Sequence, residues 1–206
     1  MKVTASFAIE NRLWNRGKKL IVGIDEVGRG AFAGPVVVAG VIFPPFAKCL
    51  ENIRDSKLCT AKAREKFDVE IKEQSLAWKI VEESVETINK FGIGKAVQRA
   101  FLNLANSFLP KPDHYLIDAF YIDHLPKFNQ QPIVRGDQIS ASIAAASIIA
   151  KVYRDRLMAT FDNTFPAYAF AQNKGYGTKL HCKAITQNGL SPLHRTSFDL
   201  RQYLVG

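Results

Sequence analysis

The chain has 206 residues, enough for one domain with a proper buried core, and its apolar fraction of 47% and charged fraction of 23% exclude general disorder. Lys and Arg outnumber Asp and Glu by 28 to 19, a net charge of +9 that favours a polyanionic partner, although it also serves simple solubility. The three cysteines form no C-x-x-C pair, and neither a leader-like segment nor an apolar run of membrane-spanning length is present, so we expect a cytoplasmic protein that does not contact membranes.

The first predicted elements lead to a pair of acids. Apolar spacing within residues 1–18 predicts a short amphipathic helix that packs on the domain. The β-branched run over 20–24 predicts a buried strand, and Asp25 and Glu26 follow it directly, before a glycine-rich turn at 28–30. Buried charges need a partner, a metal or a shifted pKa, so these acids indicate a ligand site, although a strand closed by a solvated acidic turn has the same pattern.

The next segments predict one side of a sheet. Residues 35–43 are apolar and predict a second buried strand, antiparallel to the first because the connection is short. A polar loop follows at 55–57. The amphipathic pattern of 61–74 predicts a helix that Thr60 caps, and the partial alternation over 76–81 predicts another strand.

A longer helix and a third acid-ended segment come next. Thr87 is positioned to cap a helix that runs to about Phe108, with an apolar stripe formed by Ile93, Val97, Phe101, Leu104 and Phe108. Residues 114–118 then predict an apolar strand that ends in Asp118.

The last third of the chain repeats this logic. Residues 132–137 predict a strand ending in Asp137, and a long helix rich in small residues follows over 139–161. A loop at 173–178 precedes a short helix capped by Thr178. Strands and helices alternate, so we expect one α/β domain over 1–206 with a mixed sheet, in which about 165–206 form a C-terminal helical and loop part.

The acids at the ends of these predicted strands are candidates for one site. Ligands of α/β sheets tend to lie beyond the carboxyl ends of strands. Four oxygen donors without a Cys or His cluster suit Mg²⁺ or Mn²⁺ better than Zn²⁺. Two such ions about 4 Å apart can activate water and stabilise the leaving oxygen of a phosphodiester. The leading hypothesis is therefore a metal-dependent nuclease with Asp25, Glu26, Asp118 and Asp137 at its centre.

Several polar side chains are candidates for phosphate contacts. Ser56 and Lys57 lie in a loop, and Ser147 and Lys151 lie one turn apart on the long helix. Each of them alone is more often a solvated surface residue. His181 and His194 are near the loop that carries Tyr176, and each is either a general acid or a satisfied structural residue.

Eight motifs occur in order along the chain: Gly23–Gly30 (GIDEVGRG), Ala33–Val37, Asp55–Lys57, Leu116–Asp118, Gly136–Asp137, Ser142–Lys151, Asn173–Thr178 and Ser191–Arg195. Together they resemble ribonuclease HII, a family that cleaves RNA in RNA–DNA hybrids, over nearly the whole chain. The resemblance implies an RNase H-like fold with a mixed five-stranded sheet flanked by helices and a helical C-terminal part. It also implies a divalent-metal site, with Mn²⁺ or Mg²⁺ held by the four acids.

The resemblance also implies a substrate and roles for the loops. The substrates are RNA–DNA hybrids and duplex DNA with embedded ribonucleotides, which the enzyme cuts 5′ of the ribonucleotide, as in DNA replication and repair. Gly28, Arg29 and Gly30 would hold the 2′-hydroxyl, and Tyr176 would recognise the RNA-to-DNA junction, whereas a core-packing role is the other interpretation of Tyr176. The intact Gly-Arg-Gly loop and short N-terminus favour this family over the related ribonuclease HIII. We expect a monomer.

Three other functions fit parts of the sequence. A junction resolvase of the same fold would cleave without any 2′-hydroxyl. A non-catalytic nucleic-acid-binding module would suit the basic charge, but four acids would weaken its phosphate binding. A metal-free ribonuclease would need a paired-histidine motif, which we do not find.

Overall fold

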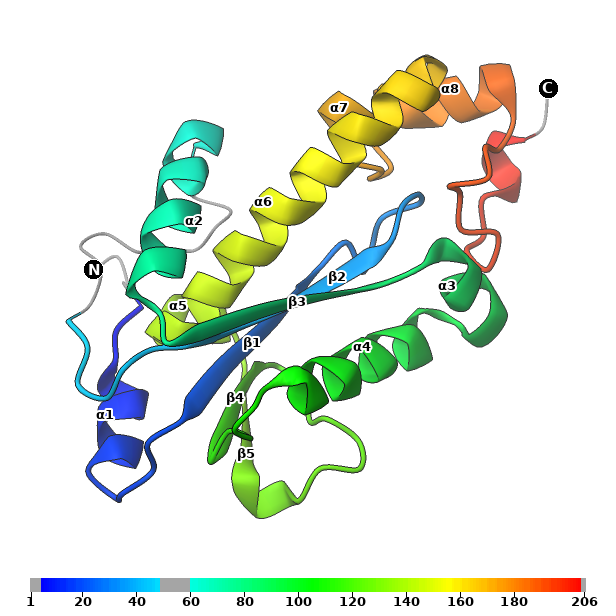
Figure 1. Cartoon of the computed structure of the whole chain (residues 1–206). Coiled ribbons are helices and arrows are strands. Elements are labelled where there is room, and N and C mark those ends of the chain that lie inside the picture. The colour runs from blue at the N-terminus through cyan, green and yellow to red at the C-terminus, as the bar shows by residue number, and fades with distance from the viewer. Residues whose placement is uncertain (1–4, 49–59, 205–206) are drawn as a thin grey trace.

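The computed structural model describes residues 5–48 and 60–204. In these residues a mixed sheet of five strands, in the order β3-β2-β1-β4-β5, lies between helices on both faces (Figure 1). β1 is central because it pairs antiparallel with β2 and parallel with β4. This is the mixed sheet expected from the sequence, with the strand bounds β1 Ile21–Val27, β2 Val36–Ile42, β3 Ala77–Glu83, β4 His114–Asp118 and β5 Gln130–Ile133.

The helices form a layer on each face of the sheet (Figure 1). The long α6 crosses one face together with α1 and α2, and α4 covers the other. The expected caps hold α2 and α8, since the side chains of Thr60 and Thr178 accept hydrogen bonds from backbone N–H groups of the first turn. The helical bounds are α1 Ala8–Trp14, α2 Ala61–Gln74, α3 Val85–Phe91, α4 Ile93–Ser107, α5 Gly136–Ile139, α6 Ala141–Thr164, α7 Phe170–Asn173 and α8 Lys179–Asn188.

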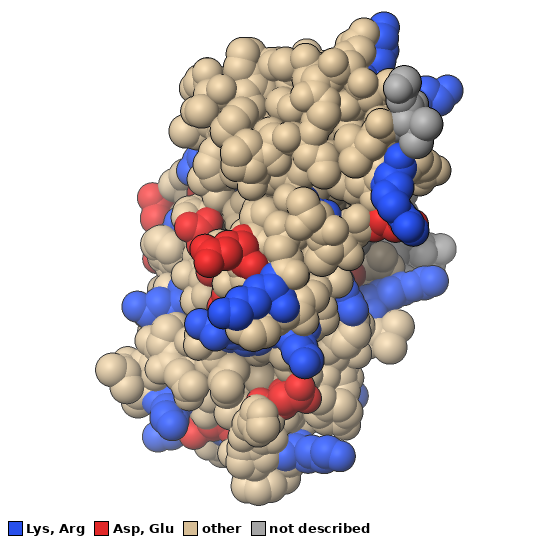
Figure 2. All heavy atoms as spheres, turned by 90° about the vertical axis from the view of Figure 1, so that its right-hand side faces the viewer, with Lys and Arg blue, Asp and Glu red and all other residues tan. Residues whose placement is uncertain are grey.

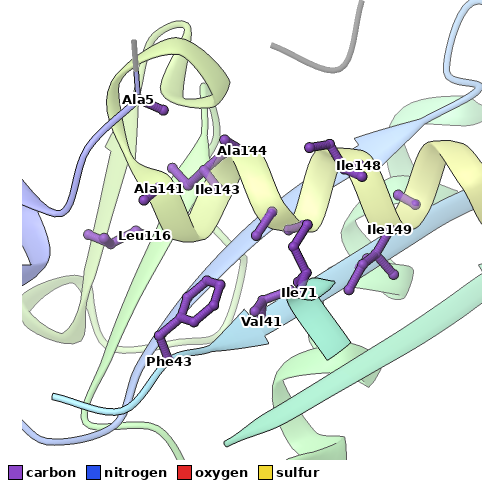
Figure 3. Close-up of a cluster of buried hydrophobic side chains, with 14 of the residues drawn as sticks. Ala5, Val41, Phe43, Ile71, Leu116, Ala141, Ile143, Ala144, Ile148 and Ile149 are labelled. Atoms are coloured by element: carbon purple, nitrogen blue, oxygen red, sulfur yellow. The ribbon is translucent and has the colours of Figure 1, made fainter. Parts of the chain in front are cut away.

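The core between α6 and the sheet explains the small residues of that helix. Gly23 of β1 faces the backbone of Ser142, and a Cβ at position 23 would collide with it. The helix therefore runs very close to the strand, and its side chains fill the space above the sheet with Val41, Phe43 and Leu116 (Figure 3). On the other face, Phe101, Leu104 and Phe108 pack against the opposite side of the strands, as their spacing predicted.

The predicted helix from Thr87 to Phe108 is two helices, so that prediction was wrong. Ser84, not Thr87, caps α3, and its Oγ accepts from the N–H of Thr87 at 3.1 Å. Gly92, with φ of 81°, ends α3 and begins α4, because a residue in that conformation cannot continue a helix.

The predicted strand over 132–137 was also wrong at its C-terminal end. β5 stops at Ile133, and Arg135 adopts a left-handed conformation that starts the short helix α5. Asp137 therefore lies in the first turn of a helix and does not end a strand. The predicted helix over 139–161 is confirmed in substance, but Ser140 interrupts it and caps α6, which continues to Thr164.

The residues after α6 pack around its C-terminal end, where α7 and α8 lie (Figure 1). A third apolar cluster joins them to the loop after β1 through Ala33, Met158 and Phe170. Within the described part of the chain, no helix is both long and apolar enough to cross a membrane.

Candidate active site

The parallel pairing of β1 with β4 brings the first acids together. Ile24 is paired with Ile117, so Asp25 and Asp118 are the next residues on two adjacent strands. Both line one cleft at the carboxyl ends of these strands. Side chains from α6 and from the loop before α8 complete this cleft, whose lining is Asp25, Glu26, Val27, Asp118, Ser147, Lys151 and Tyr176.

Asp25 lies in an environment that disfavours its charged form. Its side chain is buried, and its Oδ1 accepts a hydrogen bond from the N–H of Glu26 at 2.8 Å. Burial raises the pKa of Asp25 well above its usual value, the charges of Glu26 and Asp118 raise it further, and the hydroxyl of Ser147 opposes the shift by hydrogen bonding to the carboxylate. A cation in the cleft would relieve this desolvation and repulsion.

Asp118 and Asp137 are connected through the start of α5. The Oδ1 of Asp118 accepts from the N–H of Gly136 at 2.7 Å, and Asp137 is the next residue, buried at 3% exposure. Asp137 is not among the residues that line the cleft. Within residues 5–48 and 60–204, no three acidic, His or Cys side chains are grouped closely enough to hold a metal ion together. The four-acid ligand set therefore stays a prediction.

The donor chemistry of the cleft nevertheless fits a divalent cation. Its three carboxylates are hard oxygen ligands, and among the described residues neither a His nor a Cys lines it. Burial and the charges of Glu26 and Asp118 raise the pKa of Asp25, so a bound cation would favour its charged form.

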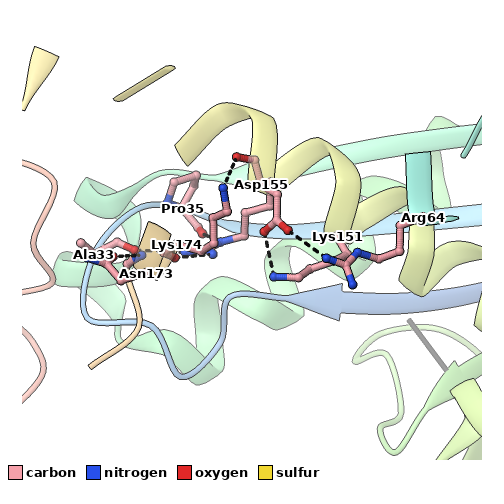
Figure 4. Close-up of polar contacts among 9 residues, drawn as sticks. Ala33, Pro35, Arg64, Lys151, Asp155, Asn173 and Lys174 are labelled. Atoms are coloured by element: carbon pink, nitrogen blue, oxygen red, sulfur yellow. Dashed lines mark hydrogen bonds and ion pairs between the residues drawn. The ribbon is translucent and has the colours of Figure 1, made fainter. Parts of the chain in front are cut away.

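Basic side chains from three segments gather around Asp155 of α6: Lys151 of α6, which also lines the cleft, Arg64 of α2, and Lys174 after α7 (Figure 4). The Nζ of Lys151 donates to the Oδ1 of Asp155 at 2.8 Å, and the Nη2 of Arg64 lies 3.8 Å from the other oxygen of Asp155. Lys174 donates to the backbone carbonyl of Asp155 at 3.3 Å. One carboxylate thus contacts two cations, and of these Lys151 lines the cleft. Ser56 and Lys57 lie outside the described residues.

The Gly-Arg-Gly loop contains two glycines with different surroundings. Gly28 has φ of 87°, and a Cβ there would collide with the guanidinium of Arg154. A Cβ at Gly30 would meet nothing within 4 Å. Between them, the half-exposed Arg29 lies over the ring of Phe120 at 4.4 Å, with its Nη1 3.9 Å from the Oε1 of Glu26. Gly28 is thus fitted to the protein interior, whereas Gly30 faces open space.

Tyr176 lies at the edge of the cleft, half-buried. Its ring is near two cations, the Nζ of Lys151 at 5.8 Å and the guanidinium of Arg154 at 5.4 Å from the ring centre. The predicted loop position is therefore confirmed, and the ring borders the acids instead of packing in a core.

Two buried arginines support both loops, and sequence reasoning missed the role of each. Arg154 donates to the carbonyls of Pro35, Lys174 and Ala33 at 2.8–3.1 Å. Arg195 donates to those of Arg29 and Gly34 at 2.9 Å. One signal in the sequence could have predicted that Arg154 points toward the site. Its spacing places it on the same face of α6 as Ser147 and Lys151.

Comparisons with known proteins agree with this arrangement. The family model described as Ribonuclease HII matches residues 22–201. The chain belongs to the ribonuclease HII family. A curated ribonuclease HII from Koribacter versatilis is 48% identical over 88% of this chain and 70% of its own length. A second, from Syntrophomonas wolfei, is 41% identical over 92% and 74%.

Membership of this family establishes the activity and the fold. The chain has ribonuclease HII activity, the cleavage of RNA in RNA–DNA hybrids and at embedded ribonucleotides. Among solved structures, the ribonuclease H2 from Pyrococcus horikoshii superposes with a TM-score of 0.71, at 22% identity over 89% of this chain and 96% of that one. A ribonuclease HII from Archaeoglobus fulgidus, solved as a complex with PCNA, gives 0.69 at 22% identity over 88% and 97%. The RNase H-like fold is thereby confirmed.

Proposed function

We propose that the cleft at the ends of β1 and β4 hydrolyses the phosphodiester bond on the 5′ side of a ribonucleotide, with water as the attacking group and divalent ions as the cofactor. The single observation that carries this proposal is the convergence of Asp25, Glu26 and Asp118 on one cleft, where burial and neighbouring carboxylates raise the pKa of Asp25. A structure of the related ribonuclease HIII from Bst was determined in complex with Mn²⁺, at 19% identity and a TM-score of 0.66 over 90% of this chain and 69% of that one.

Each acid has a role in the proposed site. Mn²⁺ or Mg²⁺ would be held by Asp25, Glu26, Asp118 and Asp137. When bound, the ion neutralises the developing charge and lowers the pKa of water, so that hydroxide can attack. Asp25 is held for this task by the N–H of Glu26 and the hydroxyl of Ser147. Asp118 is held by the N–H of Gly136. The products would be a 3′-hydroxyl and a 5′-phosphate.

Side chains of the rim would hold the substrate's phosphates. Lys151 and Ser147 line the cleft from α6, and Ser56 and Lys57 stay predictions from the sequence. The net charge of +9 supports a phosphate-dominated interface. On the face shown in Figure 2, lysine and arginine side chains are spread widely, and acidic ones gather in small patches. We expect affinity to fall steeply with salt, because each phosphate contact releases counterions.

The loops would distinguish RNA from DNA through the 2′-hydroxyl, which donates and accepts hydrogen bonds. Gly30 has open space beside its Cα, so the backbone of the Gly28–Gly30 loop can approach a ligand closely there. Arg29 extends from the same loop toward Glu26. Tyr176, whose loop is bonded to the segment after Gly30 through the carbonyl of Gly175, would place its ring against the deoxyribose that follows the ribonucleotide.

The experiment that tests this proposal is cleavage of a labelled duplex carrying one ribonucleotide, with Mn²⁺, with Mg²⁺ and with a chelator. We expect cleavage with either ion, none with chelator, and a 5′-phosphate on the downstream fragment. Cyclic 2′,3′-phosphate ends would make the 2′-hydroxyl the nucleophile and would overturn the proposed chemistry. Equal cleavage of the all-DNA duplex would favour a junction resolvase. That the enzyme acts as a monomer in the cytoplasm remains a prediction, which sedimentation and cell fractionation can check.

A further inference from the structure

Two buried histidines lie behind the tyrosine loop, outside the cleft. His181 of α8 and His194, in the segment that follows α8, are 0% and 1% exposed, and their Nε2 atoms are 3.1 Å apart. Neither lines the cleft, so neither can exchange a proton with substrate there. Their rings are surrounded by the aromatic side chains of Tyr168 and Phe170.

The fixed groups at each end of the pair determine where its protons lie. The N–H of Ser191 donates to the Nδ1 of His194 at 2.8 Å, so this nitrogen carries no proton. At the other end, the Nδ1 of His181 lies 3.0 Å from the backbone carbonyl of Tyr176, which can only accept, so this nitrogen carries one. Two neutral rings then have one arrangement left, in which the Nε2–H of His194 donates to the Nε2 of His181.

The result is a directed chain of hydrogen bonds that ends on Tyr176. It runs from the Ser191 N–H through both rings to the Tyr176 carbonyl, and every donor meets an acceptor. Burial lowers the pKa of both rings, that of His194 to about 4, which agrees with neutral rings at physiological pH. The same carbonyl also accepts from the N–H of Thr178 at 2.7 Å.

The histidine chain adds a restraint at the Tyr176 carbonyl to a loop that is held at other points. The N–H of Tyr176 donates to the carbonyl of Asn173 at 3.0 Å, and the carbonyl of Gly175 accepts from the N–H of Phe32 at 2.8 Å. The tyrosine ring itself lies more than 5 Å from the cations of Lys151 and Arg154. A ring that must lie flat against one sugar loses affinity when its backbone can rotate.

We propose that His181 and His194 are positioning residues for Tyr176, which fix its backbone through one tautomeric arrangement and thereby set the preference for a ribonucleotide followed by deoxyribonucleotides. This inference rests on the proposed role of Tyr176 in substrate binding. The histidines act on the tyrosine alone and contribute nothing to the acids of the cleft.

The variants His181→Asn and His181→Leu test the proposal. The two new side chains are nearly isosteric, but only Asn can donate to the Tyr176 carbonyl from near the position of the histidine Nδ1. Both variants lose the contact with His194, so we expect similar losses in thermal stability. The measured quantity is the ratio of kcat/KM on a duplex with one ribonucleotide to kcat/KM on a continuous RNA–DNA hybrid. We expect this ratio to fall about tenfold in His181→Leu and to stay within about twofold in His181→Asn.

Measurements in a Tyr176→Ala background separate the possible failures. If Tyr176→Ala leaves the ratio unchanged, the role of Tyr176 is wrong and the inference falls with it. If Tyr176→Ala lowers the ratio but His181→Leu does not, only the inference is overturned. We expect His181→Leu to have no further effect on the ratio once the tyrosine ring is gone, and an equal effect there would show that it acts elsewhere.

The tautomers give a check that needs neither catalysis nor a variant. Long-range ¹H–¹⁵N spectra of the wild-type protein at neutral pH should show a protonated Nδ1 on His181 and a protonated Nε2 on His194. The opposite assignment on either ring, or a doubly protonated ring, would contradict the chain of hydrogen bonds.

Discussion

The two sides of the cleft hold buried charge with different partners. On the acidic side, Asp25 is buried next to Glu26 and Asp118, and burial and their repulsion raise its pKa. On the loop side, Arg154 and Arg195 are also fully buried, and burial lowers the pKa of both, but backbone carbonyls accept from each of them. Like charges are neighbours on the acidic side, which fits the proposed metal site, whereas the hydrogen bonds of the arginines hold the loops in place.

Asp118→Asn, on the acidic side of the cleft, should have the largest effect, a loss of cleavage activity. An asparagine oxygen can still accept from the N–H of Gly136, but a charge beside Asp25 is lost. We expect the rate of cleavage to fall roughly 10³-fold or more, since a correctly held metal ion stabilises the charge of the transition state by several kcal/mol. Without added metal the midpoint of thermal unfolding should stay the same or rise, because repulsion decreases. Near-normal turnover in a quantitative cleavage assay would remove Asp118 from the mechanism.

Arg154→Ala, on the loop side of the cleft, should lower the stability of the fold. It deprives the carbonyls of Ala33, Pro35 and Lys174 of a charged donor, and we expect the free energy of unfolding to fall by about 3 kcal/mol. Urea denaturation measures this loss. Arg201→Ala is the matched control, because that arginine is exposed and pairs with the exposed Asp199, so we expect no measurable loss. Equal losses in the two variants would contradict the supporting role of Arg154.

The two glycines of the Gly-Arg-Gly loop allow a structural role and a substrate-binding role to be compared within one turn. Gly28→Ala should destabilise the fold by about 2 kcal/mol, because of its positive φ and the collision with Arg154. Gly30→Ala should leave stability within about 0.5 kcal/mol, yet lower cleavage at a single ribonucleotide about tenfold. Thermal unfolding and cleavage rates measured on both variants check this. If Gly30→Ala cleaves normally, the backbone at Gly30 does not approach the substrate.

The smallest effect concerns an acid at the opposite end of the sheet. Asp113, just before β4, accepts from the N–H groups of Lys19 and Leu20 at 2.8 and 2.9 Å, and these bonds lower its pKa. Its stabilisation should be complete above the unfolded-state pKa of about 3.9 and be lost as the pH falls through the lower folded-state value. We therefore expect Asp113→Asn to be less stable than wild type by at most about 1 kcal/mol at pH 7. Thermal unfolding at pH 7 and at about pH 2 should show the gap closing, and a gap that widens in acid would contradict the assignment.

Local patterns predicted the elements and part of the site. Asp25, Glu26 and Asp118 were predicted as site candidates because a short apolar run ending in acids is visible within a few residues, and the parallel pairing of β1 with β4 brings Asp25 and Asp118 to one cleft. The caps at Thr60 and Thr178 are equally local. Family resemblance added the proposed roles of Gly28–Gly30 and of Tyr176, which no residue pattern alone predicts.

What the sequence could not show depends on distant contacts or on single backbone angles. Asp137 was assigned to a strand because a left-handed Arg135 gives no signal in a residue pattern. The two helices α3 and α4 were merged because one glycine inside a helical pattern is often tolerated. Arg154 and Arg195 were missed because their partners are carbonyls up to 166 residues away, and every residue type offers a carbonyl.

That separation has a consequence for how the molecule becomes active. The bonds from Arg195 to Arg29 and Gly34 close a loop of more than 160 residues, the kind of contact that a folding chain makes late. The acids of β1 and β4 and the residues of α6 can assemble before it forms. We therefore expect the Gly-Arg-Gly loop to become fixed late in folding, after the acids of β1 and β4 have come together.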